Sequence, residues 1–454
     1  MILIDKSMRW GEHMDALSIN REYIDMVLKD PELYLQDYKK TVEKVKNSKA
    51  QYKGKPIPFL YNPMFFTEED VENFKKIGSI MISIANKVTK RYIEDEDYRK
   101  KFGFPKFIEE LILLENGYDI NVPIGRFDIF YKDYDNFKFC ELNTDGSSAM
   151  NEDNTLAEIL LETEAMKRFR SKYTFNLFEL FDSWVKESID IYKKYDPNNP
   201  KPNVAIVDFT ESGTTEEFKE FKRAYVRNGY NCIIADPRDL TYRDGKLYFK
   251  DYRIDLVYRR IVTFELIEKI KEIPDFIEAY KNRAMCTIGS LRSQVVHNKI
   301  IFKILHDEDT LEFLSYEERD FVKKHIPYTG LFKGDRKVFD EVLNNKDKYI
   351  MKPLDLNGSR GVFAGRDYSI EEWKKRLEEV WDKDYLYQEF YNPHKREFIV
   401  FNKEGVSVEE FGTITGLFLY NEKLAGLYTR VGKNSIISGL SQYYTLPNIL
   451  VKEG

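Results

Sequence analysis

The chain has 454 residues, of which 42% are hydrophobic and 33% charged, and its formal net charge is −6. This length predicts a large core and roughly two or three domains, and the scattered Lys and Arg argue against nucleic acid as the main partner, though not against a nucleotide. Three widely spaced cysteines without a CxxC pair argue against a disulfide framework or a structural zinc site. Without an opening signal peptide or an apolar run of about 18 residues, we expect a cytoplasmic protein that has no membrane partner.

Residues 1–100 are predicted to form a helical N-terminal region. Apolar spacing over residues 21–49 fits helices interrupted at Pro31, and residues 54–63, with three prolines, form a connector. Thr67 and the acidic residues after it are typical of a helix start, and that helix continues towards Arg91. We expect the apolar stripes here to form core rather than a functional site.

Residues 125–143 are predicted to form a hairpin of two short strands joined by a turn at residues 133–136. Since side chains alternate between the faces of a strand, Arg126 and Asp128 share one face, and Glu141 and Asn143 share one face.

If the strands pair so that these faces coincide, the hairpin gathers two carboxylates, an amide oxygen and a guanidinium. Such hard oxygen ligands suit a Mg²⁺ ion that also holds nucleotide phosphates. The alternative is an ordinary solvated hairpin face with ion pairs. Directly after the hairpin, the small and hydroxyl residues of 144–148 either leave N–H groups accessible to an anion or simply make a turn.

A long helical region is expected over residues 155–194, and the Pro- and Asn-rich residues 196–200 mark a domain boundary. Beyond it the pattern predicts a small α/β unit with a parallel sheet. Its strands are expected at residues 204–209, 232–235 and 255–259.

The polar stretch 211–215 follows the first of these strands, at the edge where open α/β sheets bind ligands. No GxGxxG motif is present, so we do not predict a dinucleotide site. Arg259 and Arg260 end the third strand. They could meet an anionic substrate or form an ordinary surface pair.

The last region carries two lysines in notable places. Lys299 opens a helix, and Lys352 lies in an apolar strand, where a lysine needs an anionic partner. Residues 357–362 form a glycine loop directly after Lys352, and its Gly358, Ser359 and Gly361 can close over phosphates with their backbone N–H groups. The strand lysine would supply the point charge. Further strands are expected at residues 385–390, 397–401, 413–419 and 424–430.

Over roughly residues 100 to 450 the chain resembles the circularly permuted ATP-grasp enzymes, most closely the synthetase domain of glutathionylspermidine synthases. The firmest part is Arg126-Phe127-Asp128, twelve intervening residues, and then Glu141-Leu142-Asn143-Thr144-Asp145. The resemblance implies that Asp128, Glu141 and Asn143 bind Mg²⁺, and that Arg126 meets the phosphoryl or acyl-phosphate group.

Four later segments carry the rest of the resemblance, in the order expected of a permuted chain. They imply a nucleotide-contacting lysine, a second ATP lysine with a phosphate lid, a segment bordering the adenine, and a late arginine facing the reacting phosphate. The corresponding residues are Lys299; Lys352 with Gly358, Ser359 and Gly361; Gln388, Glu389 and Phe390; and Arg430.

The implied fold class is α/β (α+β), a circularly permuted ATP-grasp fold with an inserted pre-ATP-grasp-like domain. Ordinary ATP-grasp chains deliver the lysines before the metal carboxylates, whereas here the hairpin comes first; the same site can still assemble, because function depends on spatial arrangement. The expected domains are the helical region (1–100), the metal-binding part of the core (101–196), the small α/β domain (197–285), and the ATP-binding lid with the remaining core (286–454).

The implied function is an ATP-dependent carboxylate–amine ligase that uses ATP and Mg²⁺ and forms an acyl phosphate. Its substrates would be a small-molecule or peptide carboxylate and an amine. Some family members carry an amidase domain upstream, which we do not find here, so only ligase activity is expected. The alternative is a nucleotide-binding scaffold or regulatory protein without ligase chemistry, although buried charges without a role are costly. The sequence names neither substrate nor oligomeric state.

Overall fold

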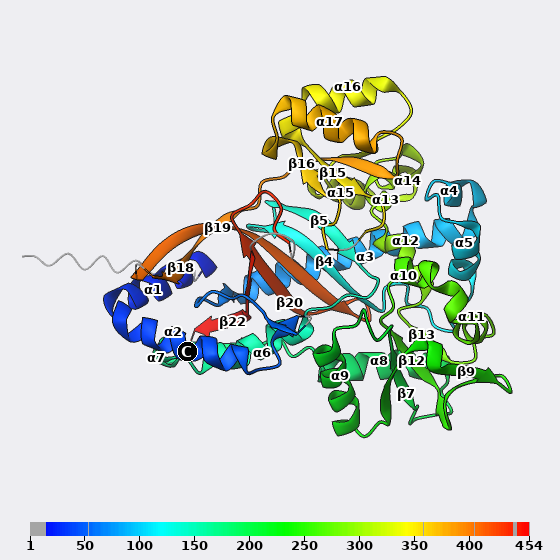
Figure 1. Cartoon of the computed structure of the whole chain (residues 1–454), viewed down its shortest axis with the longest axis horizontal. Helices are drawn as coiled ribbons and strands as arrows, with labels where there is room; N and C mark the ends of the chain where they lie inside the picture. Colours follow the sequence, from blue (N-terminus) through cyan, green and yellow to red (C-terminus); the bar gives the residue numbers. More distant parts are fainter. Residues whose placement is uncertain (1–14, 53, 357, 404, 439–442, 454) are drawn as a thin grey trace, which may run out of the picture.

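The computed structural model describes residues 15–453 except residues 53, 357, 404 and 439–442. The protein is a mixed α/β structure, which confirms the predicted class. Figure 1 shows a central sheet in the middle, a helix-covered lobe above it and an α/β unit below it. The first helices of the chain, in blue, lie on the left. The predicted Asn357 of the glycine loop lies outside the described residues.

The central sheet joins strands that lie far apart in the sequence. Its described strands run in the order β21-β20-β19-β4-β5, all antiparallel, with β18 paired to β19. The long β19 therefore pairs on one side with β20, which contains Arg430, and on the other side with β4 of the hairpin. The strands are β4 (Ile124–Tyr131), β5 (Phe137–Asn143), β18 (Lys395–Asn402), β19 (Gly405–Tyr420), β20 (Lys423–Gly432) and β21 (Tyr443–Leu446).

The hairpin β4–β5 forms as its alternation predicts. Phe127 and Ile129 are fully buried in the core, which fixes the face that β4 presents inward. The turn is held by Asp133, whose Oδ1 accepts hydrogen bonds from the backbone N–H groups of Asp135 (3.0 Å) and Asn136 (2.9 Å). Arg126 pairs with Asn143, and Asp128 with Glu141. The predicted coincidence of the two polar faces is confirmed.

The first hundred residues contribute helices and, contrary to a purely helical prediction, short strands. Pro31 is the first residue of the second helix, and Thr67 caps the third helix in a capping box with Asp70, so both predicted helix boundaries are confirmed. The elements are α1 (Ala16–Lys29), α2 (Pro31–Lys46), β1 (Gln51–Tyr52), β2 (Lys55–Pro56), β3 (Met64–Phe66), α3 (Glu68–Glu94), α4 (Glu96–Lys100) and α5 (Lys106–Leu113). Helix α3 contacts β19 and β20 of the central sheet.

The helical region expected over residues 155–194 is interrupted by one strand that was not predicted. The segment contains α6 (Met150–Leu161), α7 (Glu164–Phe169), β6 (Tyr173–Leu177) and α8 (Asp182–Tyr195). Strand β6 forms because it pairs antiparallel with β22 (Asn448–Glu453), which also pairs in parallel with β3. A partner strand at the other end of the chain overrides the local pattern.

The small α/β unit contains the predicted parallel sheet, with its strands in the order β13-β12-β7-β8. Helix α9 packs on β8 and α8. The elements are β7 (Val204–Val207), α9 (Thr215–Arg227), β8 (Cys232–Ala235), β9 (Leu240–Arg243), β10 (Lys246–Phe249), β11 (Tyr252–Ile254), β12 (Leu256–Arg259), α10 (Thr263–Glu268), α11 (Pro274–Lys281) and β13 (Cys286–Ile288).

The upper lobe in Figure 1 is an antiparallel sheet, β14-β17-β15-β16, covered by α16 and α17. Fully buried Trp373 packs in its separate core. The elements from residue 294 to residue 389, some of which lie outside this lobe, are α12 (Gln294–His297), α13 (Ile300–Ile304), α14 (Glu308–Phe313), α15 (Tyr316–His325), β14 (Thr329–Leu331), α16 (Arg336–Asn344), β15 (Tyr349–Pro353), β16 (Phe363–Ala364), α17 (Ile370–Val380) and β17 (Tyr385–Glu389). Among the described residues, no helix is both long and apolar enough to cross a membrane.

Asp153 in α6 is a buried carboxylate with a predictable effect on stability. Its Oδ1 accepts a hydrogen bond from the backbone N–H of Asn448 (3.1 Å), while its Oδ2 has no partner among the described residues. Burial raises the pKa of Asp153 from 3.8 to about 8. The folded protein therefore binds a proton that the unfolded chain releases, so this group lowers the free energy of unfolding as the pH rises from about 4 to about 8.

Asp153→Asn removes this titration and keeps the acceptor oxygen. One unit of pKa shift corresponds to about 1.4 kcal/mol. Between about pH 5 and pH 8, we therefore expect the free energy of unfolding of the variant to rise by about 2 kcal/mol or more relative to that of the native protein. Urea unfolding at both pH values measures this gain, with exposed Asp25→Asn in α1 as the matched control. Parallel pH profiles for the native protein and Asp153→Asn would contradict it.

Candidate active site

A cavity of about 690 Å³ lies where the central sheet, the upper lobe and the α/β unit meet. Its lining includes most of the residues that the sequence singled out. These are Arg126, Glu141, Asn143, Lys299, Lys352, Gly358, Ser359, Gln388, Glu389, Phe390 and Arg430. The other two predicted site residues are not part of this lining: Asp128 is buried, with 1% exposure, whereas Gly361 is exposed and lies beside Tyr385.

Three oxygen-bearing side chains of the hairpin converge at one point. The Nδ2 atom of Asn143 lies 3.3 Å from Oδ2 of Asp128 and 3.3 Å from Oε2 of Glu141. Among the described residues, no group of three or more His, Cys, Asp or Glu side chains could hold a metal ion. The candidate metal ligands are therefore a mixed set of two carboxylates and one amide, and this donor chemistry fits Mg²⁺ if the amide presents its oxygen.

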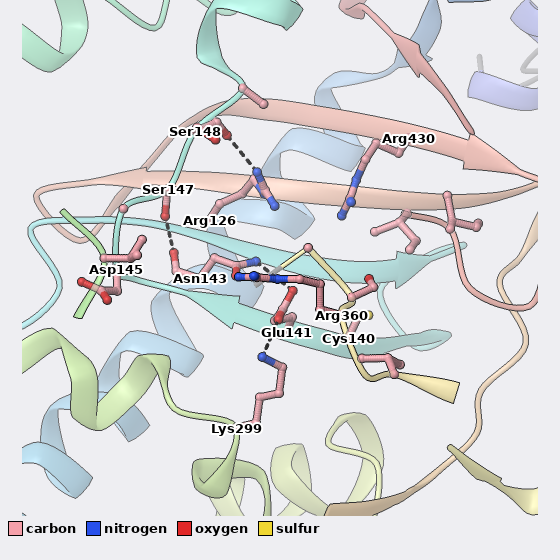
Figure 2. Close-up of a pocket in the computed structure, with 18 of the residues that line it drawn as sticks. Arg126, Cys140, Glu141, Asn143, Asp145, Ser147, Ser148, Lys299, Arg360 and Arg430 are labelled. Atoms are coloured by element: carbon pink, nitrogen blue, oxygen red, sulfur yellow. Dashed lines mark hydrogen bonds and ion pairs between the residues drawn. The ribbon is translucent and has the colours of Figure 1, made fainter. Parts of the chain in front are cut away.

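Two arginines hold Asp128 from the cavity side. Arg126 donates from Nε to Oδ1 (2.6 Å) and from Nη2 to Oδ2 (3.0 Å), and Arg430 donates from Nη2 to Oδ2 (2.9 Å). Burial opposes the charge of Arg126, but Asp128 outweighs it and raises the pKa of the guanidinium. Figure 2 shows Arg126 and Arg430 projecting from their strands on the same side of the sheet. Two fixed positive charges therefore border the candidate metal ligands.

Glu141 is ionised and paired with Lys299. Their Oε1 and Nζ atoms lie 3.0 Å apart, and Figure 2 shows Lys299 reaching Glu141 from the side opposite the arginines. Burial alone would raise the pKa of Glu141, but Lys299 and Lys352 lower it to about 2. Lys299 also donates to the carbonyl oxygen of Leu356 (3.0 Å), at the start of the glycine loop.

Lys352 is 9% exposed and is held by neutral groups. Its Nζ donates to Oε1 of Gln388 (2.7 Å) and to the carbonyl oxygen of Cys140 (3.1 Å). Neither acceptor is the anionic partner that a buried lysine was expected to have. Glu141 acts on this ammonium through its charge without accepting either hydrogen bond. Burying an ammonium is costly, and an anionic ligand in the cavity would offset that cost.

If the cavity binds ATP, as the resemblance implies, Lys352→Met should weaken that binding by at least about tenfold, since a charge-assisted contact to phosphate is worth more than about 1.4 kcal/mol. The same variant should unfold at an equal or higher denaturant concentration, because the buried charge is removed. Calorimetric ATP titration and urea unfolding measure the two effects, with exposed Lys374→Met as the control. Unchanged ATP affinity would contradict the assignment of Lys352.

Three described residues of the glycine loop have a left-handed backbone. Gly358, Ser359 and Gly361 all have positive φ values, of 66°, 59° and 73°. Arg360 in the same loop also lines the cavity, and in Figure 2 it extends towards Asn143 and Glu141. Sequence reasoning gave Arg360 no role, although a cation between glycines of a phosphate loop was a usable signal.

The end of β17 forms another wall of the cavity. Gln388 donates from Nε2 to Oγ1 of Thr329 (2.8 Å), and the N–H of Glu389 donates to the carbonyl oxygen of Tyr328 (2.9 Å). The N–H of Phe390 donates to the carbonyl oxygen of Lys348 (2.7 Å). The predicted adenine-bordering segment thus lies in the cavity with fixed backbone and side-chain positions.

The two arginines at the end of β12 are buried, so their interpretation as an ordinary surface pair is wrong. Arg259 forms an ion pair with Asp145 (2.6 Å), and Arg260 forms one with Glu217 (3.0 Å). Arg260 lines the cavity, and its Nε atom has no partner in the part of the chain that the structure describes. Sequence reasoning missed Glu217, because its burial depends on how the α/β unit packs against the hairpin loop.

The loop after the hairpin, residues 144–149, forms the wall of the cavity between the hairpin and the α/β unit. Arg126 donates from Nη1 to the carbonyl oxygen of Ser148 (2.8 Å), as Figure 2 shows, and Glu217 accepts a hydrogen bond from the N–H of Ala149 (2.9 Å). Ala149 has a φ of 92°, a region that costs energy for a residue with a Cβ atom. The α/β unit thus holds this loop in a strained conformation.

Carboxylates predominate on the side of the cavity that the α/β unit forms. Burial raises the pKa of Asp208 to about 7, while Lys269 and then Arg238 hold the pKa of Glu211 at about 2. The polar stretch after β7 contributes to this wall, as the strand-end argument suggested. The carboxylate residues are Asp208, Glu211, Glu265 and Glu268.

Comparison with known proteins places this arrangement in a family. No curated protein sequence matches the chain. A solved structure of a glutathione synthetase-like effector from Globodera pallida is similar in fold, with a TM-score of 0.54, 10% identity, and coverage of 93% of this chain and 98% of that one. A crystal structure of a putative gamma-glutamylcysteine synthetase from Methylobacillus flagellatus gives a TM-score of 0.45 at 10% identity, covering 82% and 88% of the two chains.

A family model also matches most of the chain. Residues 52–450 match the family described as "Glutathionylspermidine synthase preATP-grasp". This span contains the hairpin, the α/β unit, both lysines, the glycine loop and the late arginine. The chain therefore belongs to the glutathionylspermidine synthase preATP-grasp family.

Proposed function

We propose that the protein is an ATP-dependent ligase that joins a carboxylate to an amine, with ADP and phosphate as the other products. The observation that carries this proposal is the convergence of the hairpin oxygens, two lysines and two arginines on one cavity. Family membership supports it. The arrangement would be that of a circularly permuted ATP-grasp enzyme, with the hairpin strands preceding the lysines in the chain.

The nucleotide would lie between the upper lobe and the central sheet. Lys299 and Lys352 would hold its phosphates, Gly358 and Ser359 would cover them, and Gln388 to Phe390 would border the adenine. Asp128, Glu141 and Asn143 would hold Mg²⁺, which when bound supplies positive charge to the phosphates. The pKa of Glu141, near 2, keeps this carboxylate ionised at neutral pH.

The substrate carboxylate would attack the terminal phosphoryl group and become an acyl phosphate. Arg126 and Arg430 would stabilise the charge that develops on the transferring oxygens. An amine would then attack the acyl carbon and release phosphate. The carboxylate-rich wall of the α/β unit suits an amine that arrives as a cation, and the family name points to a thiol peptide and a polyamine as first substrates to try.

The test combines ATP and Mg²⁺ with three carboxylates (glutathione, γ-glutamylcysteine and glutamate) and three amines (spermidine, putrescine and glycine). We expect ADP release that needs both a carboxylate and Mg²⁺, and a product whose mass equals carboxylate plus amine minus water. Hydroxylamine in place of the amine should give a hydroxamate. Nucleotide binding without any carboxylate-dependent ADP release would instead support a binding protein without ligase chemistry.

A further inference from the structure

Glu152 is a buried carboxylate in the cavity that the proposed ATP and metal sites do not use. It lies in the first turn of α6 and is 7% exposed. Its Oε2 accepts a hydrogen bond from the hydroxyl of Tyr428 (2.8 Å). The ring of Tyr428 lies 5.1 Å from the guanidinium carbon of Arg126 and 5.7 Å from that of Arg430. Glu152 is thus linked through one side chain to both arginines.

The surroundings of Glu152 favour its protonated form. Burial raises its pKa, the Tyr428 hydrogen bond lowers it, and the charge of Glu217 raises it again; the net shift is upward. The charged and titratable groups that act on Glu152 or feel its charge come from several elements: Arg126 of β4, Asp153 of α6, Glu217 of α9, Tyr428 and Arg430 of β20, and Tyr443 of β21. Glu152 therefore binds a proton more readily than an ordinary glutamate.

Other carboxylates of the cavity bind protons poorly. Glu141 and Glu211 have pKa values near 2, and Arg259 holds the pKa of buried Asp145 below its usual value against the effect of burial. Asp208 is the rival, with a pKa of about 7. The charges that act most strongly on Asp208, however, are those of Arg260, Glu265 and Arg259 of the α/β unit, and not those of Arg126 and Arg430.

We propose that Glu152 is the catalytic base that takes a proton from the attacking amine. The inference rests on the proposed ligase function. The amine arrives as an ammonium ion and gives one proton to the carboxylate of Glu152. Its nitrogen lone pair then forms the C–N bond with the acyl carbon, and the C–O bond to the phosphoryl group breaks. Phosphate leaves with that electron pair and takes the second nitrogen proton, as HPO₄²⁻.

Glu152→Gln separates this role from the earlier phosphoryl transfer. The assay uses ATP, Mg²⁺ and glutathione, with either spermidine, whose amines are protonated at neutral pH, or hydroxylamine, which is mostly neutral and needs no base. Amide formation should fall by about 10² to 10⁴-fold, the usual contribution of a general base, while hydroxamate formation is little changed. Glu152→Asp, which keeps a carboxylate, should regain part of the amide formation.

The pH profile provides a second readout. In the native protein, amide formation should fall towards acidic pH as Glu152 becomes protonated, and Glu152→Gln should lack this fall. Glu158→Gln, an exposed glutamate on the same helix, serves as the matched control and should behave as the native protein.

Three outcomes would overturn the inference. Equal losses with spermidine and hydroxylamine would mean that Glu152 acts in folding or phosphoryl transfer. Native amide formation by Glu152→Gln would mean that it has no role. A selective loss in Asp208→Asn, with none in Glu152→Gln, would assign the base to the α/β unit. If the native protein forms neither product, the proposed function itself is wrong, and this inference falls with it.

Discussion

Glu141→Gln is expected to lower ATP-dependent turnover by more than about 100-fold, because even residues that only orient metal ligands typically contribute 10 to 100-fold. The substitution removes one proposed metal ligand and the charge that pairs with Lys299 at 3.0 Å. The side chain of Glu141 is 29% exposed, so its loss should disturb the fold little. Turnover measured over a series of Mg²⁺ concentrations should show a higher requirement for the metal.

Asp128→Asn is a less selective version of this experiment. Asp128 is 1% exposed and lies between Arg126 and Arg430. Removing its charge leaves two guanidiniums uncompensated, and breaking such a buried pair typically costs about 3 to 5 kcal/mol of stability.

Glu110→Gln, exposed on α5, is the matched control for Glu141→Gln. Native turnover in both Glu141→Gln and Asn143→Ala would show that the hairpin is not part of the active site.

Arg430→Ala should lower turnover by about 10² to 10³-fold, the usual effect of removing one donor that stabilises developing charge. ATP affinity should change much less, because this contact strengthens only in the transition state. The variant should remain folded, since Arg126 keeps both of its hydrogen bonds to Asp128.

The measurement pairs steady-state turnover with calorimetric ATP binding. Arg430→Lys, which keeps the charge but not the planar fork, should fall between the native protein and Arg430→Ala. An equal loss of ATP affinity and turnover in Arg430→Ala would place the arginine on the nucleotide rather than on the transferring phosphoryl group.

The hairpin shows which parts of this site the sequence can predict. Alternation in β4 and β5, with a turn centred on Asp133, predicts both strands and the polar face of each, because a slip of one residue would expose Phe127 and Ile129. The register that brings the two polar faces together includes an irregularity after Asp128, which alternation does not predict. The lysine and glycine-loop segments could be recognised as well, because their residue types are unusual for the apolar strands and turns around them.

Features that depend on distant parts of the chain could not be predicted in this way. The local pattern predicts helix over β6, but a strand forms there, because it pairs with β22 at the opposite end of the sequence. The buried pair of Arg260 with Glu217 arises only when the α/β unit packs on the loop after the hairpin. Nothing in the residues around Glu152 indicates that Tyr428, far along the chain, would contact it.

The most direct test of the proposed reaction follows the oxygen atoms of the carboxylate substrate. With isotopically labelled oxygen in that carboxylate, one label should appear in the released inorganic phosphate, because the acyl phosphate forms through a carboxylate oxygen and later breaks at its C–O bond. Nucleotide analysis of the same reaction should show ADP and no AMP. Label in AMP, with release of pyrophosphate, would contradict the acyl-phosphate route and the proposed roles of Arg126 and Arg430.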